Sequence, residues 1–237
     1  MKEVHFVLQG KGGVGKSFIS SMLAQYLMKK HGEHVKCYDT DPVNQTFSQY
    51  KALNVETVNI LTEHQTIDSS KFDSLIESII NYDGISIIDN GAATFVPLMQ
   101  YLAENDVINL LLESEIIVIT HVPLQGGQAF NDTLNGLSKT LQTESIVIPW
   151  LNNHPNKLAY SKESFSHLPM LQSTSKILGV VELPHRNPDT FGKDIQLMTS
   201  KSLTFDEVAH SPLFTLMPKQ RLKRVKDEIF DQLKDFI

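Results

Sequence analysis

Gly10-Lys11-Gly12-Gly13-Val14-Gly15-Lys16-Ser17 is the stretch that decides the fold of this 237-residue chain. It matches the G-x-x-x-x-G-K-[ST] pattern of a phosphate-binding loop, which needs a strand before it and a helix after it. The apolar run Val4–Leu8 and the amphipathic stretch Phe18–Lys30 predict that context. The glycines let backbone N–H groups close around a phosphate, and the helix N-terminus adds partial positive charge. The sequence therefore predicts a nucleoside triphosphate site.

Two side chains of the loop have separate expected tasks. Lys16 can reach the β- and γ-phosphate oxygens, and the Ser17 hydroxyl can ligate Mg²⁺. The predicted nucleotide-binding residues of the loop are Gly10, Lys11, Gly12, Gly13, Val14, Gly15, Lys16, Ser17 and Phe18.

Apolar, β-branched runs alternate with helical periodicity along the whole chain. The predicted strands are Val4–Gln9, His34–Tyr38, Val55–Leu61, Gly84–Asp89, Ile116–Thr120, Ser145–Leu151 and Ile177–Leu183. The predicted helices are Lys16–His31, Phe72–Asn81, Val96–Leu112, Gln128–Thr143 and Pro218–Phe236. Near-continuous apolar strands that alternate with helices predict an α/β fold, a mostly parallel twisted sheet with helices on both faces. We expect one domain over residues 1–237, with a loop and a short helix between Asn152 and Ser175.

Composition narrows the classes of partner and compartment. The net charge of −6 argues against whole-protein affinity for nucleic acid or anionic membrane, but leaves a local basic patch open. The single cysteine, Cys37, excludes a disulfide within the chain. The start of the chain, Met1-Lys2-Glu3, leads into a short strand without the apolar core of a signal peptide. Polar residues interrupt the apolar stretch Val107–Val122, so this stretch is not expected to span a bilayer. Together these features lead us to expect a cytoplasmic protein.

Acidic residues follow two predicted strands. Asp39 and Asp41 end the second strand, and Pro42 stops any helix there. Asp89 follows the apolar run Ile85–Ile88, which is the Walker B pattern of a residue that holds Mg²⁺ through a water. Ligands of open α/β sheets bind at this carboxyl edge, although acids after strands also cap helices.

Together, Lys11–Ser17, Asp39-Thr40-Asp41-Pro42 and Ile88-Asp89 resemble the ParA/MinD family of ATPases with a deviant Walker A loop. The resemblance implies a dimer that forms face to face around two ATP molecules. It also implies that Lys11 reaches the partner's phosphates, as a cation supplied in trans where charge develops. Asp39 would support the metal shell, and Asp41 would orient the attacking water.

These roles define the predicted site, beyond the phosphate loop itself. The predicted catalytic residues are Lys11, Lys16 and Asp41, and the predicted metal-site residues are Ser17, Asp39 and Asp89. The wording of the three motifs looks most like plasmid-borne members, the TraL-type proteins of conjugal transfer and the StbB-type proteins of plasmid stability. This narrower resemblance implies plasmid transfer, stability or positioning, with slow ATP hydrolysis until a protein partner acts.

The chain departs from the family pattern at three places. Phe18 replaces a common threonine and cannot donate to the α-phosphate. Val43-Asn44-Gln45 replaces the usual Gln-Gly-Asn, and Asn90-Gly91 replaces a proline-containing segment. These departures predict weaker nucleotide binding or turnover than is typical.

The base is expected to be adenine. The string nearest to a guanine-reading motif, Asn156-Lys157-Leu158-Ala159, lacks the required acid. The resemblance implies that an asparagine just beyond the predicted strand Ser145–Leu151 contacts adenine, either Asn152 or Asn153. It implies a second contact from Pro184-His185-Arg186, whose predicted contributors are Pro184 and His185. As loop residues, the asparagines could instead bond their own backbone.

The predicted terminal helix opens basic and carries an apolar stripe. Covering the sheet is the favoured role of that stripe. Contact with a membrane interface or with DNA is the alternative, which implies peripheral recruitment to membrane or nucleoid.

The function predicted from the sequence is an ATP- and Mg²⁺-dependent switch that dimerises and slowly hydrolyses ATP. One alternative is a small-molecule ligase or kinase on the same scaffold, similar to dethiobiotin synthetase, with Lys11 acting in cis. Another is a nucleotide-binding assembly factor with little hydrolysis.

Overall fold

A seven-stranded, entirely parallel sheet forms the centre of the protein in a computed structural model that describes residues 2–172 and 174–237. The strands are β1 (Lys2–Val7), β2 (Val35–Asp39), β3 (Glu56–Thr57), β4 (Ile85–Asp89), β5 (Ile116–Gln125), β6 (Ile146–Asn152) and β7 (Val181–Leu183). They lie in the order β3-β2-β4-β1-β5-β6-β7, with the strand that leads into the phosphate loop at the centre. The predicted fold class is confirmed.

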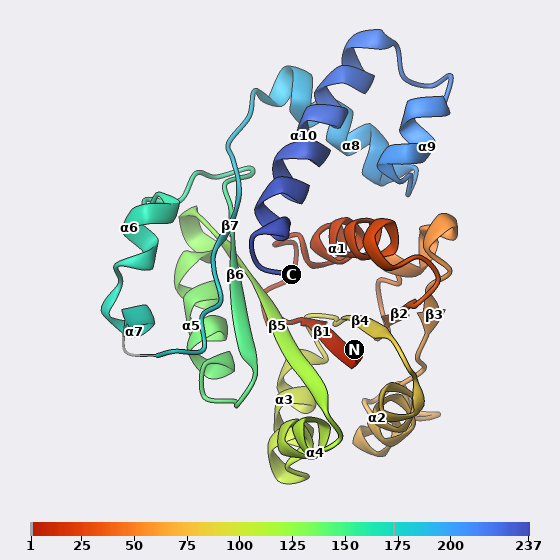
Figure 1. The fold of residues 1–237 in the computed structure, drawn as a ribbon, viewed down its shortest axis with the longest axis vertical. Helices are drawn as coiled ribbons and strands as arrows, with labels where there is room; N and C mark the ends of the chain where they lie inside the picture. The colour runs from red at the N-terminus through yellow and green to blue at the C-terminus, as the bar shows by residue number, and fades with distance from the viewer. Residues whose placement is uncertain (1, 173) are drawn as a thin grey trace.

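Helices cover both faces of this sheet (Figure 1). One face carries α1 (Lys16–His31), α8 (Lys193–Ser200), α9 (Phe205–His210) and α10 (Leu216–Lys234). The other face carries α2 (Phe72–Asn81), α3 (Phe95–Glu104), α4 (Val107–Glu113), α5 (Phe130–Thr140), α6 (Lys162–Ser166) and α7 (Pro169–Gln172). Because the strands are buried on both faces, they read as nearly continuous apolar runs.

Several elements differ from the sequence prediction. The single helix predicted over Val96–Leu112 is wrong, because the chain turns between α3 and α4 at Asp106, whose φ is 50°. Aspartate tolerates this left-handed conformation better than most residues, but neither glycine nor proline marks the break. Strand β7 is shorter than Ile177–Leu183, and β5 is longer than Ile116–Thr120.

Two helices in the C-terminal part, α8 and α9, were not predicted. A sequence signal exists for α9, because Thr204 and Glu207 form a capping box around its first turn. The last helix, α10, buries the apolar stripe Leu222, Val225, Ile229 and Leu233 in the core that contains α1. Within the described ranges, no helix combines the length and the apolar character that crossing a bilayer requires.

A chain of polar side chains runs through this core under α1. Trp150 Nε1–H donates to His121 Nδ1 at 2.9 Å, which leaves His121 to donate from Nε2 to His5 Nδ1 at 3.0 Å. His5 Nε2–H in turn donates to the Glu3 carboxylate at 3.1 Å. His5, His121 and Trp150 are fully buried, so each ring nitrogen must have a partner. Both histidines are therefore neutral in this arrangement.

This chain of bonds predicts a loss of stability in mild acid. Burial lowers the pKa of His121 well below 6.5, and the nearby His5 lowers it further. Because the unfolded chain takes up the proton near pH 6.5 and the folded chain resists it, stability falls as the pH drops below that value. We expect a cost of about 1.4 kcal/mol per pH unit in the free energy of unfolding.

The comparison that isolates this effect is His121→Asn, which keeps an acceptor for the Trp150 N–H but does not ionise. Denaturant unfolding between pH 8 and pH 5.5 should show a shallower pH dependence for this variant than for the unaltered protein. His64→Asn, at an exposed position, is the matched control. Equal slopes for all three proteins would contradict the assignment.

Candidate nucleotide-binding site

The ends of three neighbouring strands meet at one point. In the parallel register, Asp89 at the end of β4 lies level with Val7 of β1 and with Asp39 of β2. The phosphate loop leaves β1 at this level and leads into α1, as predicted. The sheet therefore places both acidic segments beside the loop, at the edge where open α/β sheets bind ligands.

The phosphate loop has the backbone conformation that its glycines permit. Gly13 has φ of 74° and Gly15 has φ of 95°, values that favour glycine strongly. Gly15 is the N-terminal cap residue of α1, so the helix begins at Lys16. The first N–H groups of α1 thus open toward the space in front of the loop.

Lys16 extends back over the loop. Its Nζ donates to the carbonyl oxygen of Lys11 at 3.1 Å, and its side chain is buried. Burial lowers the pKa of this ammonium, while the nearby carboxylates of Asp89 and Asp41 raise it. The group is a desolvated cation with few partners of its own, which suits an anionic ligand.

Lys11 points elsewhere. Its Nζ lies 2.8 Å from an Asp132 carboxylate oxygen in the first turn of α5, and both side chains are about half exposed. The two lysines of the loop therefore face different surroundings, one inside the site and one at the surface of the same chain.

Asp89 is a buried acid at the centre of the site. Ser20 Oγ donates to its carboxylate at 2.8 Å, and Ser17 also hydrogen-bonds to it. Burial raises the pKa of Asp89 to about 7, against the lowering effect of these two hydroxyls and of Lys16. The predicted ligands Ser17 and Asp89 thus lie together, as hard oxygen donors of the kind that Mg²⁺ prefers.

Asp39 and Asp41 organise the segment after β2. The fully buried Asp39 carboxylate accepts from the backbone N–H of Asp41 at 3.0 Å and of Ser48 at 2.9 Å. Burial raises the pKa of Asp39, and these backbone bonds oppose the rise. Asp41 accepts from the N–H groups of Val43 and Asn44 at 2.9 and 3.0 Å. Asp39 therefore holds the segment in place, whereas Asp41 lies beside the open space.

A close approach links this segment to the one after β4. A Cβ on Gly91 would come within 2.7 Å of the Asp41 carboxyl carbon, so only glycine fits there. The buried Asn90 side-chain oxygen accepts from the hydroxyls of Thr40 at 3.2 Å and Thr94 at 2.7 Å. Asn90, at a departure from the family pattern, thus joins the ends of β2 and β4 to the start of α3.

Gln9 is a site residue that sequence reasoning missed. Its Oε1 accepts from the Gly10 N–H at 2.9 Å, and its Nε2 donates to the carbonyls of Pro123 and Thr133. It thereby ties the phosphate loop to β5 and α5. The available sequence signal was an amide side chain at the end of an apolar strand, directly before a glycine-rich loop.

A cavity of about 1130 Å³ opens in front of the loop and extends to α8 and α10. From the predicted loop residues it is lined by Gly12, Gly13, Gly15, Lys16, Ser17 and Phe18. The residues at its far end are mostly apolar and include Leu183, Pro184, Ile195 and Ile229. Gly10, Lys11 and the buried Val14 belong to the loop but do not line this cavity.

The two candidate asparagines at the end of β6 differ in their surroundings. Asn152 lines the cavity and donates to the Val14 carbonyl in the phosphate loop at 3.1 Å. Asn153 does not line it; its Nδ2 donates to Glu182 at 2.9 Å, and its Oδ1 accepts from the Leu158 N–H at 2.8 Å. The carbonyl of Asn153 also pairs with the His185 ring at 3.1 Å. The structure thus brings Asn152 and Pro184 to the cavity, but not Asn153 or His185.

Arg186 and Glu228 form an ion pair at the cavity wall, between the loop after β7 and α10. The guanidinium also lies over the Phe191 ring, 4.7 Å from its centroid, and Arg224 approaches the same carboxylate at 2.8 Å. The last helix is therefore part of the site, a contribution that its sequence did not reveal.

The burial of Asp89 predicts that removing its charge stabilises the protein. The folded carboxyl has its pKa raised from 3.8 to about 7, so the folded state is penalised progressively as the pH rises through that interval. Asp89→Asn keeps an acceptor for Ser20 and should raise the free energy of unfolding by about 1 to 4 kcal/mol at pH 8, and by less at pH 5.5. Denaturant unfolding at the two pH values measures this gain. Asp231→Asn, an exposed control, should show no gain, and a destabilised Asp89→Asn would refute the account.

A family profile and a full-length relative match this sequence. The sequence profile of the CobQ/CobB/MinD/ParA nucleotide binding domain matches residues 5–193. A protein named TraL from Escherichia coli is 39% identical over 239 residues, which cover 99% of this chain and 98% of that protein.

Two solved structures share the fold. The MinC:MinD cell division protein complex of Aquifex aeolicus matches with a TM-score of 0.55 at 15% identity, over 98% of this chain and 96% of that one. A plasmid partition protein from Borrelia burgdorferi matches with a TM-score of 0.50 at 12% identity, over 100% and 99%. The profile and the TraL relative confirm the family expected from the three motifs: the chain belongs to the CobQ/CobB/MinD/ParA family of nucleotide-binding proteins and is related to TraL.

Proposed function

We propose that this protein is an ATP-dependent switch that dimerises when it binds Mg-ATP and hydrolyses ATP slowly. The observation that carries the proposal is the separation of the two loop lysines. Lys16 lines the cavity, whereas the Lys11 ammonium lies outside it beside Asp132. A surface cation next to a phosphate site is available to a second chain, which supports the role in trans over the role in cis.

The proposed ligand set follows from the chemistry of the side chains. Backbone N–H groups of the phosphate loop and Lys16 would hold the β- and γ-phosphates. The Ser17 hydroxyl and the Asp89 carboxylate would hold Mg²⁺, Asp89 through a water, with Asp39 supporting the shell. Bound Mg²⁺ would neutralise charge on the phosphate oxygens, which is the chemistry it supplies in phosphoryl transfer. Among the described residues no cluster of three or more histidine, cysteine, aspartate or glutamate side chains could hold a metal ion, which suits an ion held largely by the Ser17 hydroxyl, phosphate and water.

Hydrolysis needs a positioned water and charge stabilisation. Asp41 lies at the cavity and would orient a water for in-line attack on the γ-phosphorus. The bond from that phosphorus to the bridging oxygen breaks, which yields ADP and inorganic phosphate. Lys16 in cis and Lys11 from the second chain would stabilise the charge that develops. With Lys11 supplied only by a partner, a monomer would turn over slowly.

The contacts of Asp41 and Asn90 would couple the bound nucleotide to the conformation of the segment that starts α3. Asp41 packs against Gly91, and Asn90 bonds both Thr40 and Thr94. A γ-phosphate that moves Asp41 would therefore shift the segment that starts α3. In such a switch, the γ-phosphate orders a segment of the chain and its hydrolysis releases that segment, as happens in other nucleotide-hydrolysing proteins.

The relatives indicate the process. The relative that matches nearly the whole chain is named TraL. The motif resemblance described above connects TraL-type proteins with conjugal transfer. We propose that this protein acts in the cytoplasm as one nucleotide-binding domain. It would serve conjugal transfer, plasmid stability or positioning through a protein partner that reads the dimer.

Substitutions in the loop separate binding from dimerisation. Lys16→Ala should lower ATP affinity by at least tenfold, because a desolvated charge partner of the phosphates is lost. Lys11→Ala should keep the affinity of the monomer within about threefold, since its ammonium lies outside the cavity. Isothermal titration with Mg-ATP measures both.

Dimer formation gives the complementary readout. In size-exclusion chromatography with Mg-ATP, Asp41→Ala should accumulate as a loaded dimer because hydrolysis stops, and Lys11→Ala should remain monomeric. Asp132→Ala, the matched change at the surface partner of Lys11, should still dimerise. An Asp41→Ala protein that stays monomeric would contradict the proposal.

The base contact distinguishes the two asparagines. Asn152→Ala should weaken ATP binding about 5- to 30-fold, because it removes a polar group at the cavity and a bond to the phosphate loop. Asn153→Ala should lower the free energy of unfolding by about 1 to 3 kcal/mol and leave ATP affinity nearly unchanged. The reverse pattern in titration and denaturant unfolding would assign the base to Asn153.

A further inference from the structure

The corner between α9 and α10 exposes large apolar side chains. Leu216, the first residue of α10, is 80% exposed, Met217 is 58% exposed and Leu213 is 57% exposed. Isolated apolar residues are common on protein surfaces, but three within five positions are not scattered. Phe214, in the middle of them, is buried in the core and anchors the corner.

The chain around this corner is basic. From Val208 to Lys226 there is no aspartate or glutamate, and the cations are Lys219, Arg221, Lys223, Arg224 and Lys226. Ion pairs occupy three of them: Arg221 with Asp194, Arg224 with Glu228, and Lys226 with Asp206. Lys219 and Lys223 have no carboxylate within ion-pair distance in the part of the chain that the structure describes.

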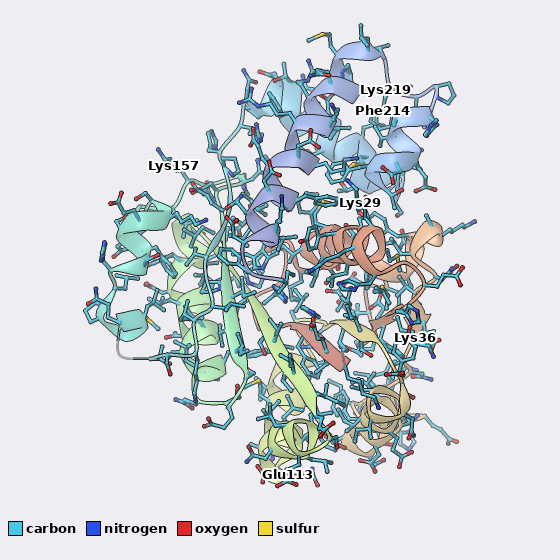
Figure 2. The ribbon with its side chains drawn as sticks, in the orientation of Figure 1. Lys29, Lys36, Glu113, Lys157, Phe214 and Lys219 are labelled. Atoms are coloured by element: carbon cyan, nitrogen blue, oxygen red, sulfur yellow. The ribbon has the colours of Figure 1, made fainter. Side chains whose placement is uncertain are left out.

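The corner lies at the outer end of the C-terminal helices. Figure 2 shows Phe214 and Lys219 close to each other near the start of α10, far from the sheet. Figure 1 shows that α10 runs from this point back toward α1, so its beginning is the part that projects. None of Leu213, Leu216 and Met217 lines the cavity in front of the phosphate loop.

We propose that this corner, formed by Leu213, Leu216 and Met217 with Lys219 and Lys223, docks the protein on an anionic phospholipid bilayer. The three apolar side chains would enter the boundary between headgroups and acyl chains, and the two lysines would lie among the anionic headgroups. The net charge of −6 keeps the remaining surface away from such a bilayer, so the contact is confined to this corner. The site is independent of the proposed ATPase function.

Other partners fit the corner less well. A nucleic acid backbone would use the lysines but leave the three apolar side chains in water. The core of a protein–protein interface is depleted in lysine. Laying the whole of α10 on a membrane would first require its stripe to leave the protein core, where Leu222 and Ile229 are buried. Docking by the corner needs no such step.

The test is co-sedimentation of the full chain with vesicles of phosphatidylglycerol or of phosphatidylcholine, without nucleotide and with Mg-ATP. The unaltered protein should bind phosphatidylglycerol vesicles at least tenfold more tightly than phosphatidylcholine vesicles. Leu216→Ser with Met217→Ser should weaken that binding at least tenfold, because two apolar side chains no longer leave water. Lys219→Gln with Lys223→Gln should weaken it about 20- to 30-fold at physiological salt.

The matched control is Leu110→Ser with Leu112→Ser on α4, whose side chains are 45% and 43% exposed on the other face of the sheet. This variant should bind vesicles like the unaltered protein, and unfolding midpoints show that all variants are folded. Absence of binding to phosphatidylglycerol, or equal binding by the Leu216/Met217 variant, would overturn the proposal. So would binding to duplex DNA that the lysine variant loses and the apolar variant keeps, because it assigns the corner to nucleic acid.

Discussion

Asp89 ends a buried parallel strand level with Val7 and Asp39, and this alignment sets the geometry of the whole site. The carboxylate is fully shielded from water, so burial raises its pKa to about 7. Across the loop, burial lowers the pKa of Lys16. Each charge has lost hydration and has only weak compensation within the chain. A phosphate beside Lys16 and a divalent cation beside Asp89 would give each group a partner of opposite charge. The folded site would therefore favour binding of a metal–nucleotide complex.

The alignment also joins the two acidic segments. Asp39 gives both carboxylate oxygens to backbone N–H groups and so fixes the path of the chain that carries Asp41. Asp41 lies so close to Gly91 that a side chain on Gly91 would clash with it. The Asn90 side-chain oxygen accepts from the hydroxyls of Thr40 and Thr94. A small displacement at the phosphate end therefore has a direct path to α3. Arg186 and Glu228 form an ion pair in the wall of the same cavity, and Glu228 belongs to α10. The cavity therefore also borders the last helix.

Much of the fold could be predicted because its signals are local. The glycines before Lys16 and Gly32 after His31 mark both ends of α1, and apolar runs mark the buried strands. The break at Asp106 was not predicted because a left-handed aspartate leaves no clear pattern. A signal did exist for the helical segment that leads into α8, because Asn187 caps it and Pro188 lies in its first turn. The Lys11–Asp132 pair joins residues 121 positions apart and has no sequence signature. Strand alternation, in contrast, could have separated the asparagines, because Asn152 shares a face with Ile148 and Trp150, which pack in the core with α1.

The central claim is that Lys11 completes the site of another molecule, and complementation tests it most directly. Lys11→Ala and Asp41→Ala proteins should each be nearly inactive as ATPases. In an equal mixture, each mixed dimer pairs an intact Asp41 with an intact Lys11 at one of its two sites, so phosphate release should rise well above that of either variant alone, to as much as about half of the unaltered rate when all dimers are mixed. Recovery at that level supports action in trans. A mixture that stays as inactive as its components would contradict it.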